Sequence, residues 1–240
     1  PGSSEVAAST ASTPPGFFPF LIVGGLGIGI VEVAVNLEAD RVEHQVGHRI
    51  MNRSHAFWSL GFFAAGFAGA AISQWGIDVT YHLIGVAIIT SLATFLVLRN
   101  YEPAPSRQLI ESATPRFVRP TKGILMIVAF TLSAMLLEGA GIDWSVIFMR
   151  DTFHTAPFIS GAALALGALT QAIVRFFADN YVDRFGTITV AKISIVALGI
   201  GVMMVTFSPN FAVALSGFAL MGMGHGVIFP LAMSAAAQRT

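Results

Sequence analysis

Long apolar stretches separated by short polar segments dominate the hydropathy pattern of this 240-residue chain. A helix needs about 20 apolar residues to cross the roughly 30 Å hydrocarbon core of a bilayer. The stretches lack the strict alternation of a half-buried or barrel strand, so the pattern predicts helices. Seven stretches reach the required length, with approximate bounds 17–37, 55–73, 82–98, 123–142, 157–178, 188–207 and 211–236.

The composition indicates that these predicted helices are membrane spans. The chain is 55% hydrophobic and 11% charged, with a mean hydropathy of +0.74, whereas a soluble domain carries roughly 25% charged residues. We therefore predict an all-α, polytopic membrane protein, a bundle of about seven transmembrane helices in a lipid bilayer. Residues 1–16, rich in Ser, Thr, Pro and Ala, are predicted to be a disordered polar tail.

Charge and cysteine content exclude several classes of function. The formal net charge is zero, so no basic surface argues for nucleic acid, and the absence of cysteine excludes disulfides and thiolate metal sites. His44 and His48 have the spacing of a metal-binding pair, but no third ligand is apparent. We expect neither a metal nor another cofactor.

The placement of the basic residues predicts the orientation. Arginine and lysine are retained in cytoplasmic loops. Twelve of the thirteen lie in or around connections on one predicted side of the membrane, or after the last span on that side, and only Arg150 falls on the other. The N-terminus is therefore predicted to lie outside and the C-terminus in the cytoplasm.

The first span carries an acid at a depth where acids are costly. Gly25, Gly29, Glu32 and Asn36 form one stripe at helical spacing. An ionised acid at mid-membrane costs roughly 2.5 to 3.5 kcal/mol on the mildest scale, so Glu32 is a functional candidate. The structural alternative is a neutral glutamic acid hydrogen-bonded to a neighbouring helix.

Further polar residues lie in the fourth and seventh spans. Glu138 is too deep to be dismissed as a surface acid, and Asp143 beside Trp144 is a plausible sugar contact, because an indole stacks on a sugar face while a carboxylate accepts from hydroxyls. Alternatively, Trp144 is an interfacial residue and Asp143 lies in water. His225 lies centrally in the last span. Its imidazole either faces a cavity between the helices or is buried and hydrogen-bonded to a backbone carbonyl. Gln171 is a weaker candidate.

A short glycine repeat relates the first and last spans. Gly-x-Gly-x-Gly occurs at 25–29 and again at 222–226, in two spans with the same predicted direction. Two such helices six spans apart suit parallel halves of six spans each. The alternative is chance similarity between glycine-rich membrane helices, whose small residues serve close packing.

Residues 179–186 read Asp-Asn-Tyr-Val-Asp-Arg-Phe-Gly. This segment resembles the cytoplasmic loop motif of the major facilitator superfamily, an acid followed by an Asp-Arg pair and then x-Gly. The usual basic residues after the glycine are replaced by Thr187, Ile188 and Thr189. The resemblance implies a cytoplasmic gating motif made of Arg175, Asp179, Asp183, Arg184 and Gly186.

The resemblance also implies a domain organisation. The seven spans would be the fourth to the tenth of twelve in a longer protein. Residues 17–98 would then end the N-terminal bundle, 99–122 would be a cytoplasmic loop between bundles, and 123–240 would begin the C-terminal bundle.

Residues 31–36 and 47–57 look like the fourth and fifth spans of fucose-permease-like sugar:proton symporters and related bacterial permeases, and 138–145 is similar to the seventh span of that group. The resemblance implies a secondary active transporter that moves a small polar solute, a sugar being one candidate, together with protons. The position matching the proton-coupling acid is Glu32. Substrate contacts are expected from Asn36, Glu138, Asp143, Trp144 and His225.

The same resemblance implies a monomer in a bacterial inner membrane, without enzymatic activity. Proton-antiport efflux of drugs or metabolites would use the same acid and is the alternative within transport. A truncated product without transport activity of its own is another. A seven-helix receptor is disfavoured, because Lys122 and Lys192 lie near membrane borders and offer no amine for a retinal Schiff base.

Overall fold

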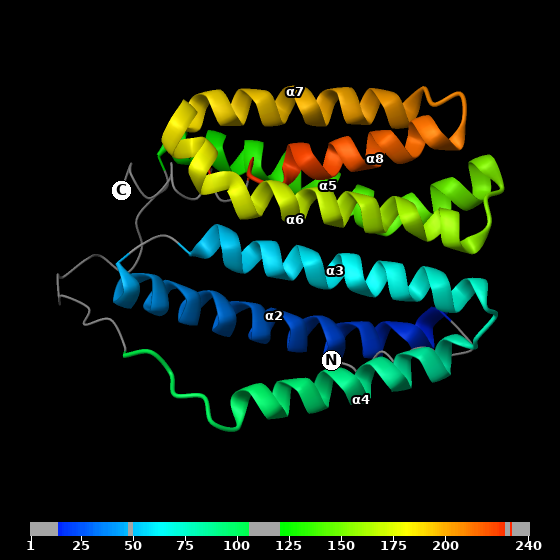
Figure 1. Cartoon of the computed structure of the whole chain (residues 1–240), viewed down its shortest axis with the longest axis horizontal. Helices are drawn as coiled ribbons and strands as arrows, with labels where there is room; N and C mark the ends of the chain where they lie inside the picture. The colour runs from blue at the N-terminus through cyan, green and yellow to red at the C-terminus, as the bar shows by residue number, and fades with distance from the viewer. Residues whose placement is uncertain (1–13, 48–49, 106–120, 229–230, 232–240) are drawn as a thin grey trace. The chain divides into compact units, whose positions relative to one another are not determined.

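The computed structural model describes residues 14–47, 50–105, 121–228 and 231, and every regular element within them is an α-helix (Figure 1). The predicted all-α fold is confirmed. The helices are α2 (Pro14–Val46), α3 (Met51–Gln74), α4 (Val79–Leu98), α5 (Lys122–Phe153), α6 (Pro157–Phe185), α7 (Thr187–Thr206) and α8 (Phe211–His225).

Six of the described helices, α2 to α7, are long and apolar enough to cross a membrane. The seventh is shorter than predicted. α8 begins after Asn210, whose side chain accepts a hydrogen bond from the Val213 amide at 3.1 Å, and it ends at His225. Glycine is a poor helix former, and Gly222, Gly224 and Gly226 crowd this end. Of the remainder of the predicted span, 229–230 and 232–236 lie outside the described residues.

Two helices extend well beyond their apolar cores. α2 continues through a polar segment to Val46, and α5 continues past Ile142 until His154 takes the left-handed conformation, with φ of 52°. Backbone hydrogen bonds do not require apolar side chains, so a helix persists past the hydrocarbon. At the other end, Pro14 to Gly16 form the first turn of α2 instead of belonging to the polar tail, because proline is well suited to a helix start.

The chain divides into two compact units. The first unit comprises residues 1–48 and 72–108, with α2 and α4, and the second comprises 49–71 and 109–240, with most of α3 and all of α5 to α8. The division therefore cuts through the end of α3, whereas the predicted N-terminal bundle contains this helix whole. The predicted domain boundaries stay a prediction.

Small residues hold the second unit together. α6, α7 and α8 run side by side (Figure 1), and a Cβ added to Gly222 would overlap the Gly167 carbonyl oxygen of α6. A Cβ on Gly224 would lie 2.5 Å from the Leu198 amide nitrogen of α7. The glycines of α8 thus allow backbone-to-backbone approach on two sides, which is how membrane helices gain packing contacts.

Candidate functional site

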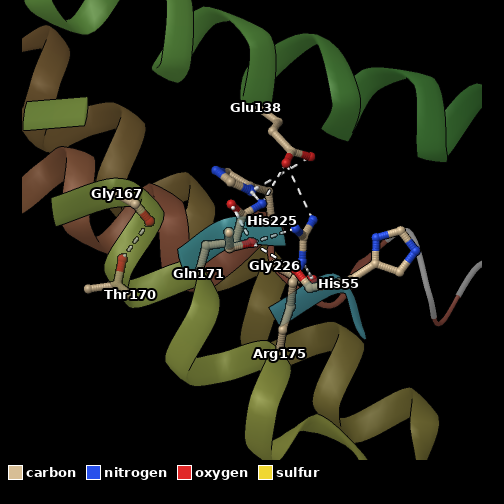
Figure 2. Close-up of polar contacts among 9 residues, drawn as sticks. His55, Glu138, Gly167, Thr170, Gln171, Arg175, His225 and Gly226 are labelled. Atoms are coloured by element: carbon tan, nitrogen blue, oxygen red, sulfur yellow. Dashed lines mark hydrogen bonds and ion pairs between the residues drawn. The ribbon is translucent and has the colours of Figure 1, made fainter. Parts of the chain in front are cut away.

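Five polar side chains from four helices meet inside the second unit. Glu138 comes from α5, Gln171 and Arg175 from α6, and His225 from α8 (Figure 2). The fifth, Ser59, comes from α3. We call these five residues the polar cluster. Gln171, Arg175 and His225 are 1%, 4% and 6% exposed, Ser59 is fully buried, and the Glu138 side chain is 16% exposed.

Helical spacing on α6 explains part of this arrangement. Gln171 and Arg175 are four residues apart, so both side chains lie on one face. Close packing of α8 against α6 adds a backbone contact. The carbonyl oxygen of Gly226, at the end of α8, accepts a hydrogen bond from Arg175 Nε at 2.8 Å. The cluster is therefore held by backbone as well as by side chains.

Gln171 contacts three other members of the cluster. Its Nε2 donates one hydrogen to Glu138 Oε1 at 2.5 Å and lies 3.1 Å from His225 Nδ1, while its Oε1 lies 3.2 Å from Ser59 Oγ. Because the amide nitrogen has only donors, His225 Nδ1 is the acceptor and the imidazole is neutral, with its proton on Nε2. Gln171 Nε2 can donate to both partners only while His225 Nδ1 carries no proton.

Arg175 carries the buried positive charge. Besides the Gly226 carbonyl, it donates from Nη1 to Ser59 Oγ at 2.7 Å and from Nη2 to Glu138 Oε1 at 3.3 Å. Its guanidinium carbon lies 5.7 Å from the ring centroid of Trp58 on α3, within cation–π range. A buried charge needs such partners, because removing it from water is expensive. Glu138 is its ion-pair partner.

A small cavity adjoins the cluster. It has a volume of about 20 Å³ and is lined by Gln171 and His225 together with apolar and glycine positions of α5, α6 and α8. This space suffices for about one water molecule. The cavity beside Gln171 and His225 therefore holds no larger solute in this conformation.

The structure brings some of the predicted site residues together and leaves others apart. Glu138 and His225, both predicted to contact substrate, lie 3.9 Å apart between Oε2 and Nδ1. Asp143 and Trp144 lie one turn or more further along α5 with exposed side chains, Trp144 being 64% exposed. Their predicted substrate contacts are not part of the polar cluster.

The predicted gating residues separate into two groups. Arg175 belongs to the polar cluster, whereas Asp179 accepts a hydrogen bond from Asn52 Nδ2 of α3 at 2.5 Å. Two atoms of this pair, Asn52 Oδ1 and Asp179 Oδ2, are buried and without a hydrogen-bond partner.

The end of the motif makes the turn between α6 and α7. Asp183 and Arg184 are exposed, and the Arg184 guanidinium lies over the ring of Phe185. Gly186 has φ of +79°, a conformation that favours glycine, and it separates the two helices. A glycine at this position is therefore a requirement of the turn itself.

Glu32 and Asn36 lie on α2 in the first unit. Glu32 is exposed and Asn36 is half-buried. The described residues provide no hydrogen bond or ion pair to Glu32, so the proton-coupling role remains a prediction from the sequence. His48, of the histidine pair considered above, lies outside the described residues.

Ser59 is the cluster member that sequence reasoning missed. It sits in a span rich in glycine, alanine and phenylalanine, where serine is a common small packing residue. Its only sequence signal is a hydroxyl within an apolar helix, which many membrane helices share. The contact with Arg175 depends on how α3 meets α6, and no local pattern encodes that.

Apolar helices around a buried, charged interior define a polytopic membrane protein with a polar site between its helices. Residues 4–240 match the Major Facilitator Superfamily, and the chain belongs to this family of membrane transporters. The predicted family is thereby confirmed.

Curated relatives agree with this assignment. The chain is 33% identical over 238 residues to an uncharacterised transporter of Sinorhizobium fredii, covering 98% of this chain and 62% of that protein. It is 27% identical to an uncharacterised MFS-type transporter of Yersinia pestis, with 95% and 59% covered, and 24% identical to membrane protein MosC of Rhizobium meliloti, with 92% and 53% covered. The chain thus spans little more than half the length of these relatives. No solved structure matches it significantly.

Proposed function

We propose that the protein containing this chain is a secondary active transporter that moves a small polar solute across a bacterial inner membrane, coupled to protons. The observation that carries this proposal is the buried polar cluster, in which one carboxylate, one neutral imidazole and one guanidinium share hydrogen bonds among apolar helices. Ionisable residues inside membrane spans typically mark substrate or proton pathways.

Proton coupling requires an acid that changes its protonation state during the cycle. Glu138 is bonded to both Gln171 and Arg175, so adding a proton to it would weaken two contacts that join α5 to α6. Glu32 is the second acid within a span, and the resemblance to sugar:proton symporters assigns it the coupling role. In this proposal Glu32 is the proton-coupling acid, and Glu138 also takes up a proton, which separates α5 from α6.

The solute would bind through hydroxyl-accepting and stacking groups. Asn36, Glu138, Asp143, Trp144 and His225 are the proposed contacts, and a sugar is one candidate solute. The turn between α6 and α7, with Asp179, Asp183, Arg184 and Gly186, is the proposed cytoplasmic gate, and the Asn52–Asp179 hydrogen bond is one contact that it would break. We further propose that the protein works as a monomer.

Uptake by cells expressing the complete gene product tests this proposal. Labelled sugars, polyols and small acids are screened for accumulation, with and without a protonophore. Accumulation should collapse with the proton gradient, and Glu32→Gln and Glu138→Gln should each abolish it, while Glu102→Gln at an exposed loop position should not. Gradient-independent accumulation, or full activity of Glu32→Gln, would contradict proton coupling. Proton-driven extrusion instead of uptake would identify the efflux alternative.

A further inference from the structure

Each of the three guanidinium nitrogens of Arg175 has a partner, but only one of them contacts the counter-ion Glu138. A guanidinium offers five N–H donors in a planar fork that fits a carboxylate with two parallel hydrogen bonds. Glu138 receives only one contact from it, 3.3 Å long, and through the same Oε1 atom that accepts the shorter bond from Gln171. Glu138 is thus in closer contact with Gln171 than with its counter-ion Arg175.

The charge balance of the cluster limits what can replace Glu138. The charged and titratable groups that contact its carboxylate are Arg175 from α6 and His225 from α8. α3 contributes the Ser59 hydroxyl and the Trp58 ring to Arg175, and its titratable His55 accepts a hydrogen bond from Ser59 through its carbonyl oxygen (Figure 2). If Glu138 takes up a proton, the guanidinium remains charged, because arginine does not lose its proton in proteins. A neutral solute would leave that charge unpaired in an apolar environment.

We propose that Arg175 is the anchor for an anionic group of the transported solute, most simply a carboxylate, which replaces Glu138 when Glu138 becomes protonated. One proton and one anionic group enter together, so the interior stays neutral. This inference rests on the proposed function and narrows its solute from small polar molecules to small organic anions.

The cavity beside Gln171 and His225 leaves little room for a solute. It holds about one water molecule, so the surrounding helices would have to move before a solute anion reached the cluster from that side. Glu138 is also the most exposed member of the cluster and the only one on α5. Its release from Gln171 and Arg175 would free α5 to move from α6 and open the guanidinium edge.

Formate, the smallest carboxylate, tests the anchor without knowledge of the natural solute. The complete gene product is purified, and formate is compared with formamide, its neutral analogue, in chloride-free buffer. Binding is followed by tryptophan fluorescence, because Trp58 lies against Arg175, and Trp58→Phe identifies its share of the signal. Glu138→Gln imitates the protonated acid. At neutral pH its affinity for formate should be at least about tenfold higher than that of the wild type.

Three further results are expected. Formamide should have no effect, the double variant Glu138→Gln/Arg175→Gln should lose formate binding, and Glu102→Gln should behave as the wild type. An equal response to formate and formamide, formate binding by the double variant, or no binding by Glu138→Gln would overturn the inference.

The wild-type protein provides a second readout if Glu138→Gln does not fold. Formate binding should take up one proton per anion from weakly buffered solution, and an infrared band of a protonated carboxylic acid should appear. Binding without proton uptake overturns the inference. Proton-driven accumulation of neutral solutes only would also overturn it while leaving the proposed function intact. Formate binding with proton uptake, but without any gradient-driven transport, would instead contradict the proposed function.

Discussion

The two units use similar apolar helices in different ways. In the second unit, α6 buries residues along most of its length, from Ser160 to Ala178, whereas none of the residues of α4 in the first unit is buried. The glycine repeat shows the same contrast, since Gly25 and Gly29 have nothing within 4 Å of an added Cβ while Gly222 and Gly224 touch neighbouring backbones. Apolar length therefore predicts a membrane span, but small residues at facing positions determine how spans pack.

The two acids within the spans differ in the same way. Glu138 in the second unit is part of a hydrogen-bonded ion pair, whereas Glu32 in the first unit is exposed. An acid with a structural partner should affect stability and transport together. An acid that acts only in the transport cycle should affect transport alone. Substitutions at matched positions in the two units test this difference.

The largest effect is expected from Glu138→Ala. It removes the ion-pair partner of Arg175 and leaves a guanidinium that cannot neutralise itself, so the free energy of unfolding should fall by about 3 to 5 kcal/mol. Glu32→Ala removes no hydrogen bond or ion pair among the described residues and should not lower it. Unfolding in mixed detergent micelles measures both. Adding Arg175→Met to Glu138→Ala should restore much of the loss, and equal effects of the two single substitutions would contradict the comparison.

Gly222→Ala should have the next largest effect. The new methyl group would overlap the Gly167 carbonyl, and overpacking of this kind costs about 1 to 3 kcal/mol. Gly25→Ala is the matched control in the first unit, and it should be neutral or stabilising because alanine is the better helix former. The same unfolding measurement applies. Stabilisation by Gly222→Ala would show that α6 and α8 do not approach as closely as described.

Ser59→Ala should have a smaller effect, about 1 to 2 kcal/mol, because Arg175 loses one acceptor but keeps the Gly226 carbonyl and Glu138. Ser133→Ala is the control, since its exposed hydroxyl bonds only to the Ala129 carbonyl of its own helix. A loss of formate affinity without a loss of stability would make Ser59 part of the anion site. Equal stability of the two variants would exclude a structural role for Ser59.

The smallest effect is expected for the hydrogen bonds of the first unit that join α2 to the segment following α4. Tyr101 donates its phenolic hydrogen to Glu38 of α2, and the Ala104 amide donates to the same carboxylate at 2.6 Å. The hydrogen bond to Glu38 raises the pKa of Tyr101 above its ordinary value of 10.0. The bond is therefore fully present below pH 10 and is lost as the pH rises through the raised pKa.

Ultraviolet titration of the phenolate measures this pKa. The difference between the wild type and Tyr101→Phe isolates Tyr101 from the other tyrosines, and its midpoint should lie above 10. Glu38→Gln should return the midpoint toward the ordinary value. A midpoint at or below 10 in the wild type would contradict the Tyr101–Glu38 hydrogen bond.

Much of the fold follows from hydropathy, whereas the polar cluster follows only in part. Six spans were predictable because a run of apolar residues of sufficient length has few alternatives to a membrane helix. The end of α8 was not, since the glycines that permit close packing also weaken the helix. Glu138 and His225 were predictable as costly residues in apolar spans. Their direct connection through Gln171 was not, because it depends on contacts between helices far apart in the sequence.

The sequence by itself determined the class of protein, the family and the acids worth testing, because hydrophobicity, charge placement and loop motifs are local properties. Only the tertiary structure decided that Arg175 joins Glu138 and Ser59 in the interior instead of belonging solely to the cytoplasmic motif. The physical reason is the cost of a buried charge, which can be met only where helices bring a counter-ion and acceptors to the same point.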